Sequence, residues 1–301
     1  MDKSNNNEKL TKVGINWYPG HMAKTKREII NNLKLIDIVI ELLDARIPIA
    51  SRNPDIYAIT KNKKKIILLN KADLSDPKTN EQWVNYFSKE APTILTDAST
   101  GKGINKISST INELMQEEIA KQQLRGLKNK TIRIMILGIP NVGKSSLINR
   151  LAKRNTAVVA NRPGVTQSNQ WIRIANNQEL LDTPGVLWPK FESEEVALNL
   201  AFTGTIKDDI LQRTEIAYEL LKRLYQEYPN ELKERYKLQD EDIKEIEQSK
   251  NFIYKLMLLI GSKRGALLSG GRIDEEKTAR IILDDFRSGK IGKISLEKPK
   301  K

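Results

Sequence analysis

One eight-residue loop constrains this chain more than any other feature of its sequence. Gly138-Ile-Pro-Asn-Val-Gly-Lys-Ser145 fits the phosphate-loop pattern G-x-x-x-x-G-K-[ST] at every fixed position. The aliphatic run 131–137 before it is typical of a buried strand, and residues 146–153 after it have helical periodicity. This order predicts that backbone N–H groups and a helix N-terminus bind phosphate. A glycine-rich turn without a ligand is the alternative, and the loop alone does not distinguish ATP from GTP.

We expect the loop to hold a nucleoside triphosphate with Mg²⁺. Lys144 would reach the β- and γ-phosphates, and the Ser145 hydroxyl would hold the metal ion. The nucleotide contacts predicted from this segment are Gly138, Pro140, Asn141, Val142, Gly143, Lys144, Ser145 and Ser146.

Composition indicates a basic, cysteine-free protein. The 301 residues suit about two domains, and the net charge is +13 with a pI near 9.6. No apolar run reaches the roughly 18 residues of a membrane span, and the N-terminus lacks the apolar core of a signal peptide, so we expect a cytoplasmic protein. The charge favours a polyanionic partner, nucleic acid first and an anionic membrane second.

Two further aliphatic runs, 36–44 and 65–70, predict strands of a sheet covered on both faces, so the expected fold class is α/β. The second run ends in Asn70-Lys-Ala-Asp73. A carboxylate at Asp73 can accept from N1–H and N2–H of guanine, a donor pair that adenine lacks. Asn70 would tie this loop to the phosphate loop, and the stem of Lys71 would cover the base. An ordinary solvated turn is the alternative.

A weaker signal follows about two dozen residues later. Thr93-Ile-Leu-Thr-Asp-Ala-Ser99 predicts a short strand and a loop containing Asp97, Ala98 and Ser99. There the backbone N–H of Ala98 could contact guanine O6. The order and distance of this loop strengthen the guanine interpretation of Asp73.

Two segments beyond the phosphate loop have the features of nucleotide-sensing switches. Residues 155–170 show little periodicity and contain Thr166, whose hydroxyl and carbonyl can complete a Mg²⁺ shell when a γ-phosphate is present. The strand at 178–182 ends in Asp182-Thr-Pro-Gly185, a D-x-x-G sequence. Asp182 would hold a water on Mg²⁺, and the Gly185 N–H would bond the γ-phosphate; a strand with a plain Pro-Gly turn is the alternative.

The motif order is rearranged, because Ras-like GTPases place N-K-x-D and the O6 loop after D-x-x-G. A site made from neighbouring strand ends survives such rejoining of the chain. This order, with Trp17-Tyr-Pro-Gly-His-Met-Ala-Lys24, Asp44-Ala-Arg-Ile-Pro48 and Asp182-Thr-Pro-Gly-Val-Leu-Trp-Pro189, resembles the circularly permuted GTPases, and among them those of bacterial ribosome biogenesis. The resemblance covers nearly everything after residue 14.

The resemblance implies a GTPase that acts in late maturation of the large (50S) ribosomal subunit and is stimulated by that particle. It implies rRNA and ribosomal proteins as partners, and K⁺ bound through Asn141. The hydrophobic Val186-Leu187 matches the family where Ras-like enzymes keep a water-orienting Gln. His21, the only histidine, matches a family residue proposed to act in hydrolysis, and a structural role is the alternative. The predicted catalytic residues are therefore His21, Lys144 and Thr166.

The expected organisation is a polar, disordered extension at 1–14, a GTPase domain at 15–193 and a helical RNA-binding domain at 194–301, in a monomer. In this part of the chain, helical patterns cover 215–225, 251–260 and 278–286. In the GTPase domain we expect a helix at 104–124 and an earlier amphipathic helix whose apolar positions are Met22, Ile29, Ile30, Leu33 and Ile36. Lys263 and Arg264 are the predicted RNA contacts, through phosphates rather than bases. The basic connector 121–130 reads either as a solvated linker or as a second RNA contact.

Two alternative functions fit the same motifs. The chain could be an RNA-binding placeholder in which GTP is only an occupancy switch and hydrolysis is incidental. A signalling GTPase acting on proteins also fits the motifs, but it leaves the net charge of +13 unexplained.

Overall fold

The computed structural model divides into two compact units. One, the sheet unit, comprises Pro19–Pro189 together with Ser295–Lys301; the other, the helical unit, comprises Met1–Tyr18 together with Lys190–Ile294. We expected the helical part to run to the C-terminus, but the last residues pack in the sheet unit, because they hydrogen-bond to it. The residues that the structure describes are 22–124, 131–153, 159–160, 171–183, 185–188, 191–206 and 212–299.

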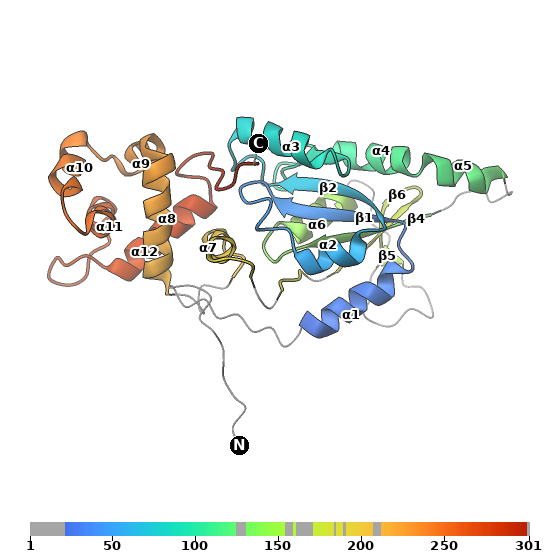
Figure 1. Cartoon of the computed structure of the whole chain (residues 1–301), viewed down its shortest axis with the longest axis horizontal. Coiled ribbons are helices and arrows are strands. Elements are labelled where there is room, and N and C mark those ends of the chain that lie inside the picture. The colour runs from blue at the N-terminus through green and yellow to red at the C-terminus, as the bar shows by residue number, and fades with distance from the viewer. Residues whose placement is uncertain are drawn as a thin grey trace, which may run out of the picture. The chain divides into compact units, whose positions relative to one another are not determined.

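Within the described residues, the sheet unit is built on a seven-stranded sheet of order β3-β2-β1-β4-β7-β6-β5. Figure 1 shows β2 lying beside β1 in this sheet. Strands β3, β2, β1, β4 and β7 pair in parallel, and β7, β6 and β5 pair antiparallel. The expected α/β class is confirmed. The strands are β1 (Ile38–Asp44), β2 (Lys64–Asn70), β3 (Thr93–Leu95), β4 (Ile132–Gly138), β5 (Val159–Ala160), β6 (Trp171–Ala175) and β7 (Gln178–Leu181).

The helices of this unit lie on both faces of the sheet. The crossovers from β1 to β2 and from β2 to β3 move the same way across the sheet, so their right-handedness puts the helices α2 and α3 on one face. The connection from β3 to β4 runs the other way across the sheet, so it puts α4 on the opposite face, where Asn112 accepts from the Gln178 side chain of β7. The helices are α1 (Met22–Leu33), α2 (Pro54–Thr60), α3 (Pro77–Phe87), α4 (Asn105–Leu114), α5 (Gln116–Leu124) and α6 (Lys144–Lys153).

Burial explains why the central strands are aliphatic. Every residue of β1 is buried, as is every residue of β2 except Lys64, so most of their side chains on both faces are apolar. The buried polar or charged exceptions are Glu41, Asp44, Lys65 and Asn70. One apolar cluster joins α1 and α2 to β1, β4, β6 and β7, and another joins Trp83 and Phe87 of α3 to β1 and β2.

Two local features differ from the expectation. The helical pattern at 104–124 forms two helices, because Met115 leaves helical geometry at φ −100° and ψ 3°. Ile30, expected on the apolar face of α1, is 42% exposed, whereas Ile29 and Leu33 are buried.

Within the residues that the structure describes, the helical unit contains the three expected helices and three more. Ser193 caps α7 by accepting from the Val196 N–H, and Asp274 caps α12 by accepting from the Lys277 N–H. None of the helices within the described residues is long and apolar enough to cross a bilayer. The helices are α7 (Glu194–Phe202), α8 (Arg213–Glu227), α9 (Pro229–Tyr236), α10 (Asp240–Glu247), α11 (Phe252–Lys263) and α12 (Glu275–Arg287).

Candidate nucleotide site

The register of the parallel strands brings three predicted loops together. Asp44 at the end of β1 lies opposite Asn70 at the end of β2, and Leu42 lies opposite Gly138 at the end of β4. The loops after these strands therefore start at the same edge of the sheet, where parallel sheets bind ligands. The rearranged motif order is thus compatible with one site.

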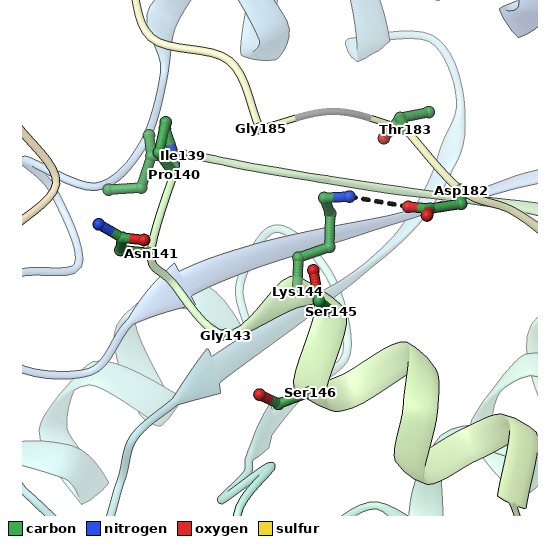
Figure 2. A pocket seen from close by; sticks show the side chains of 10 residues that line it. All are labelled: Ile139, Pro140, Asn141, Gly143, Lys144, Ser145, Ser146, Asp182, Thr183 and Gly185. Carbon is green, nitrogen blue, oxygen red and sulfur yellow. Dashed lines mark hydrogen bonds and ion pairs between the residues drawn. The ribbon is translucent and has the colours of Figure 1, made fainter. Parts of the chain in front are cut away.

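A cavity of about 710 Å³ opens between the phosphate loop and the D-x-x-G segment. Most of the predicted phosphate-loop contacts line it, and Val142 is instead buried behind the loop. Figure 2 shows the lining residues, which are Ile139, Pro140, Asn141, Gly143, Lys144, Ser145, Ser146, Asp182, Thr183 and Gly185.

Backbone geometry explains the glycine at position 143. Gly143 has φ +99°, and a Cβ there would lie 2.3 Å from Asn70 Nδ2. A side chain would therefore push the Asn70 loop away from the phosphate loop. Asn141 also has a positive φ, +60°, a conformation that Asn tolerates better than most residues.

The first turn of α6 faces the cavity. Its leading N–H groups have no intrahelical acceptors, so together with the helix dipole they favour an anion. Lys144 Nζ pairs with Asp182 Oδ1 at 2.8 Å, which joins the phosphate loop to the D-x-x-G segment (Figure 2). The cavity therefore combines one cation, one carboxylate, helix N–H groups and the Ser145 hydroxyl.

Asn70 connects the base loops to the phosphate loop. Its Nδ2 donates to the Val142 carbonyl at 2.8 Å, while its Oδ1 accepts from the Ala98 N–H at 3.1 Å and from Thr96 Oγ1 at 3.2 Å. One buried amide thus fixes three segments. The predicted tie between Asn70 and the phosphate loop is present, and the Ala98 N–H bonds to Asn70 in this structure.

The Asp97 side chain stabilises its own loop. It accepts from the Ser99 N–H and Oγ and from the Thr100 N–H and Oγ1. These hydrogen bonds lower the pKa of Asp97 although burial alone would raise it. Arg150 of α6 donates to the Ser99 carbonyl, so the helix that follows the phosphate loop also holds this loop.

A buried ion pair underlies the N-K-x-D loop. Arg46 binds both carboxylate oxygens of Asp44, with Nε at 2.9 Å and Nη2 at 2.8 Å, and Lys71 Nζ lies 3.1 Å from the same carboxylate. Burial alone would raise the pKa of Asp44, but these two cations hold it well below its usual range. The Asp44 carboxylate therefore holds the Lys71 side chain in place. The Lys71 backbone has a positive φ of +59°.

Asp73 lies in the same loop, and its side chain is exposed. Burial and the nearby Asp97 carboxylate raise its pKa. Asp73 does not line the cavity beside the phosphate loop, but Asn70, three residues earlier, bonds directly to that loop. The two predicted recognition elements are therefore adjacent.

The segment after D-x-x-G is buried. The Val186 N–H donates to the Gly138 carbonyl at 3.1 Å, and its carbonyl accepts from Asn53 Nδ2 at 3.0 Å. Leu187 is also buried, as its apolar character suggests. Asn53 additionally caps α2, so one side chain links that helix to the D-x-x-G segment.

The cavity fits a nucleotide with Mg²⁺. Ser145 and Asp182 could supply the one or two oxygen ligands that Mg²⁺ takes from a protein when phosphates and water supply the rest. Among the described residues, no cluster of three or more acidic, His or Cys side chains forms a separate metal cage. Two predicted catalytic residues, His21 and Thr166, lie outside the described residues.

Sequence reasoning missed several supports of the site. In the sequence, Asp44 and Arg46 stood out only as part of the Asp44–Pro48 motif. The sequence motifs did not predict that Asn53, Arg150 or the residues from 295 on would support the site. An Asp at a strand end with an Arg two residues later is the one local signal that could have indicated the buried pair.

Comparisons with known proteins agree with the geometry. A family model described as "50S ribosome-binding GTPase" matches residues 133–260. Ribosome biogenesis GTPase A from Bacillus pumilus is 49% identical over 95% of this chain and 99% of its own. The Thermotoga maritima protein of the same name is 32% identical over 95% of both chains.

Solved structures resemble the chain over most of its length. A GDP-bound structure of TM YlqF has a TM-score of 0.64 and 27% identity, covering 91% of this chain and 100% of that one. GNP-bound YlqF from T. maritima has a TM-score of 0.62 and 26% identity, covering 92% of this chain and 99% of that one.

Proposed function

This chain belongs to the ribosome biogenesis GTPase A family, and from that premise we propose that it binds GTP in the cavity beside Lys144 and couples hydrolysis to a late step of large-subunit assembly. The observation that carries the proposal is the Asn70 junction. It joins the loop with guanine-recognition chemistry to the phosphate loop, although about 70 residues of chain separate them. A nucleotide bound there would contact both loops.

The proposed roles follow the chemistry of the side chains. Lys144 would bind the β- and γ-phosphates, and the Gly185 N–H would bond the γ-phosphate. Asp73 would accept from the guanine base. Asp97 and Ser99 flank Ala98 in the base loop, and the Ala98 N–H, which now donates to Asn70, would exchange or share that bond to reach guanine O6. Ser145, Asp182 and Thr166 would hold Mg²⁺, which supplies charge neutralisation on the phosphates.

Two finer roles are also proposed. Asn141 would hold K⁺ through its side-chain oxygen, and replacing KCl by NaCl in the hydrolysis assay tests this role. His21 would orient the attacking water, since phosphoryl transfer depends mainly on positioning and charge stabilisation. If His21→Ala binds GTP normally and hydrolyses it at the parent rate with particles present, this role is wrong.

We propose that the helical unit contacts ribosomal RNA through phosphates. Arg264 is exposed at the end of α11 and is the better of the two predicted contacts, because Lys263 Nζ already pairs with Asp242 at 2.7 Å. Arg264→Ala should weaken particle binding at every salt concentration and reduce its salt dependence. Lys255→Ala, which removes an exposed cation from the same helix, is the control.

Single-turnover GTP hydrolysis with and without large-subunit precursor particles tests the proposed function. We expect particles to accelerate hydrolysis, with mature small subunits as the control. If particles bind the GTP form tightly but leave the rate unchanged, the placeholder function replaces the one proposed.

A further inference from the structure

The C-terminal end of the chain packs beside the guanine-recognition loop of the sheet unit. We call Ser295–Lys298 the strap. Ser295 and Leu296 are 0% and 2% exposed. The chain leaves the helical unit at Ile294, so the strap begins at the next residue.

The strap binds the loop that contains Arg46. The Leu296 N–H donates to the Arg46 carbonyl at 2.9 Å. The Glu297 carboxylate accepts from the Ile49 N–H at 2.6 Å and from the Ala50 N–H at 3.0 Å. Two consecutive residues therefore fix the backbone of the segment that follows β1.

The strap also binds the start of α3. The Asp76 N–H donates to Ser295 Oγ at 3.1 Å, and Trp83 Nε1 donates to the Glu297 carbonyl at 3.1 Å. Asp76 is the N-cap of α3, where it accepts from the Thr79 N–H. This cap lies three residues after Asp73.

These contacts reach the N-K-x-D loop from both sides. On one side Arg46 holds Asp44, and Asp44 holds Lys71. On the other side Asp76 ends the loop. The phosphate half of the site is held differently, by Asn70 on Val142 and by Lys144 on Asp182.

We propose that the strap is a positioning element for guanine recognition, which holds Asn70–Asp73 so that the Asp73 carboxylate meets N1–H and N2–H of the base. This inference rests on the proposed GTP-binding function and adds a specificity role for the last residues of the chain. Strap residues do not touch the nucleotide in this proposal; they act through Asp76 and through the segment from Arg46 to Ala50, whose backbone Leu296 and Glu297 hold. The strap should therefore influence base selectivity more than phosphate affinity.

The test compares GDP with inosine diphosphate, which lacks the 2-amino group of guanine. Dissociation constants are measured for the full chain, for Glu297→Ala and for a chain ending at Ile294. Glu81→Ala, an exposed acidic position on α3, is the matched control, and removal of residues 300–301 alone controls for lost terminal charge.

We expect Glu297→Ala to reduce the preference for GDP over inosine diphosphate by about tenfold, the value of one charge-assisted hydrogen bond. Removal of the whole strap should reduce it at least as much. Affinity for inosine diphosphate should change less than threefold in Glu297→Ala, and both controls should match the parent. Glu297→Ala decides the result if the shortened chain does not fold.

Two results would overturn the inference. One is an unchanged GDP preference in Glu297→Ala, and the other is a parallel loss of affinity for both nucleotides, which indicates general loosening of the unit. The GDP preference measured for the parent chain distinguishes failure of this inference from failure of the proposed function. If the parent itself does not prefer GDP, the guanine site is wrong rather than the role of the strap.

Discussion

Lys144 Nζ lies 2.8 Å from Asp182 Oδ1, so the lysine of the phosphate-loop motif and the D-x-x-G carboxylate neutralise each other across the cavity. The Lys144 side chain is 11% exposed and that of Asp182 is 45% exposed, so the pair stands at the border between protein and solvent. A triphosphate with its metal ion offers both groups new partners. We therefore expect nucleotide binding to break this ion pair and to give Lys144 and Asp182 new partners.

Lys144→Ala should lower the affinity for GDP by about 100-fold, because a charged hydrogen bond to phosphate contributes about 1.5–3 kcal/mol. Lys121→Ala is the control, since that lysine is 70% exposed and pairs only weakly with Glu117 on the same helix. Isothermal titration measures both. A dissociation constant for Lys144→Ala within threefold of the parent value would contradict the assignment.

Asn70→Ala should reduce both stability and nucleotide affinity. Its amide donates to the Val142 carbonyl and accepts from the Ala98 N–H and from Thr96 Oγ1. The loss of these hydrogen bonds leaves buried groups unsatisfied. We expect the free energy of unfolding to fall by at least about 2 kcal/mol. Asn85→Ala on the exposed face of α3 should change it little. Urea unfolding tests this, and equal stabilities of the two variants would be inconsistent with the proposed junction.

Arg46→Ala should destabilise the protein by about 3–5 kcal/mol, because it leaves the buried Asp44 carboxylate without its main partner. The side chains of this pair are 1% and 2% exposed. Lys26 and Asp55 form a pair of similar length whose side chains are 41% and 42% exposed, so Lys26→Ala should cost under about 1 kcal/mol. Comparable losses in the two variants would show that burial is not what gives the Asp44 pair its strength.

The pH dependence of stability should report the same pair. The pKa of Asp44 is lowered in the folded state, because Arg46 and Lys71 outweigh the effect of burial. The ionised Asp44 therefore contributes to the free energy of unfolding at pH values above 3.8, the usual pKa of this group. As pH falls below that value, the unfolded chain takes up the proton first and the contribution is lost. Urea unfolding between pH 6 and pH 3 should show a steeper decline for the parent than for Asp44→Asn. Parallel declines of the parent and Asp44→Asn would contradict this role of Asp44.

Asp73→Asn should shift base preference from guanine toward xanthine. The amide N–H of Asn can donate to the 2-oxo group of xanthine, whereas it meets the guanine 2-amino group as donor against donor. Competition between GDP and xanthosine diphosphate measures the change. An ATP-specific site would leave nucleotide choice unaltered, and that result would refute guanine recognition by this loop.

The sequence predicted the recognition loops because their chemistry depends on fixed local spacing. Gly143, Lys144 and Asn70 occupy positions where only a few residue types can work, and strand ends place them at one edge of the sheet. The contacts of Glu297 could not be predicted in this way. Its carboxylate binds backbone N–H groups 247 and 248 residues earlier, and such groups carry no residue identity.

Local periodicity also has limits that particular residues show. A helical pattern at 104–124 does not reveal that Met115 leaves helical geometry, because one distorted residue hardly alters the spacing of apolar side chains. Ile30 fits the apolar spacing of α1, yet it is exposed because the neighbouring elements cover Ile29 and Leu33 instead. Tertiary packing decides both cases.

The return of residues 295–299 to the sheet unit has a consequence for how the protein is made. Because domains fold as units during synthesis from the N-terminus, most of the strands are available while the helical unit is still being translated. Residues 295–299 follow the helical unit in the chain, so they leave the ribosome after it, and only then can Leu296 and Glu297 bind their partners. Synthesis of the helical unit must therefore be finished before the sheet unit can gain its last hydrogen bonds.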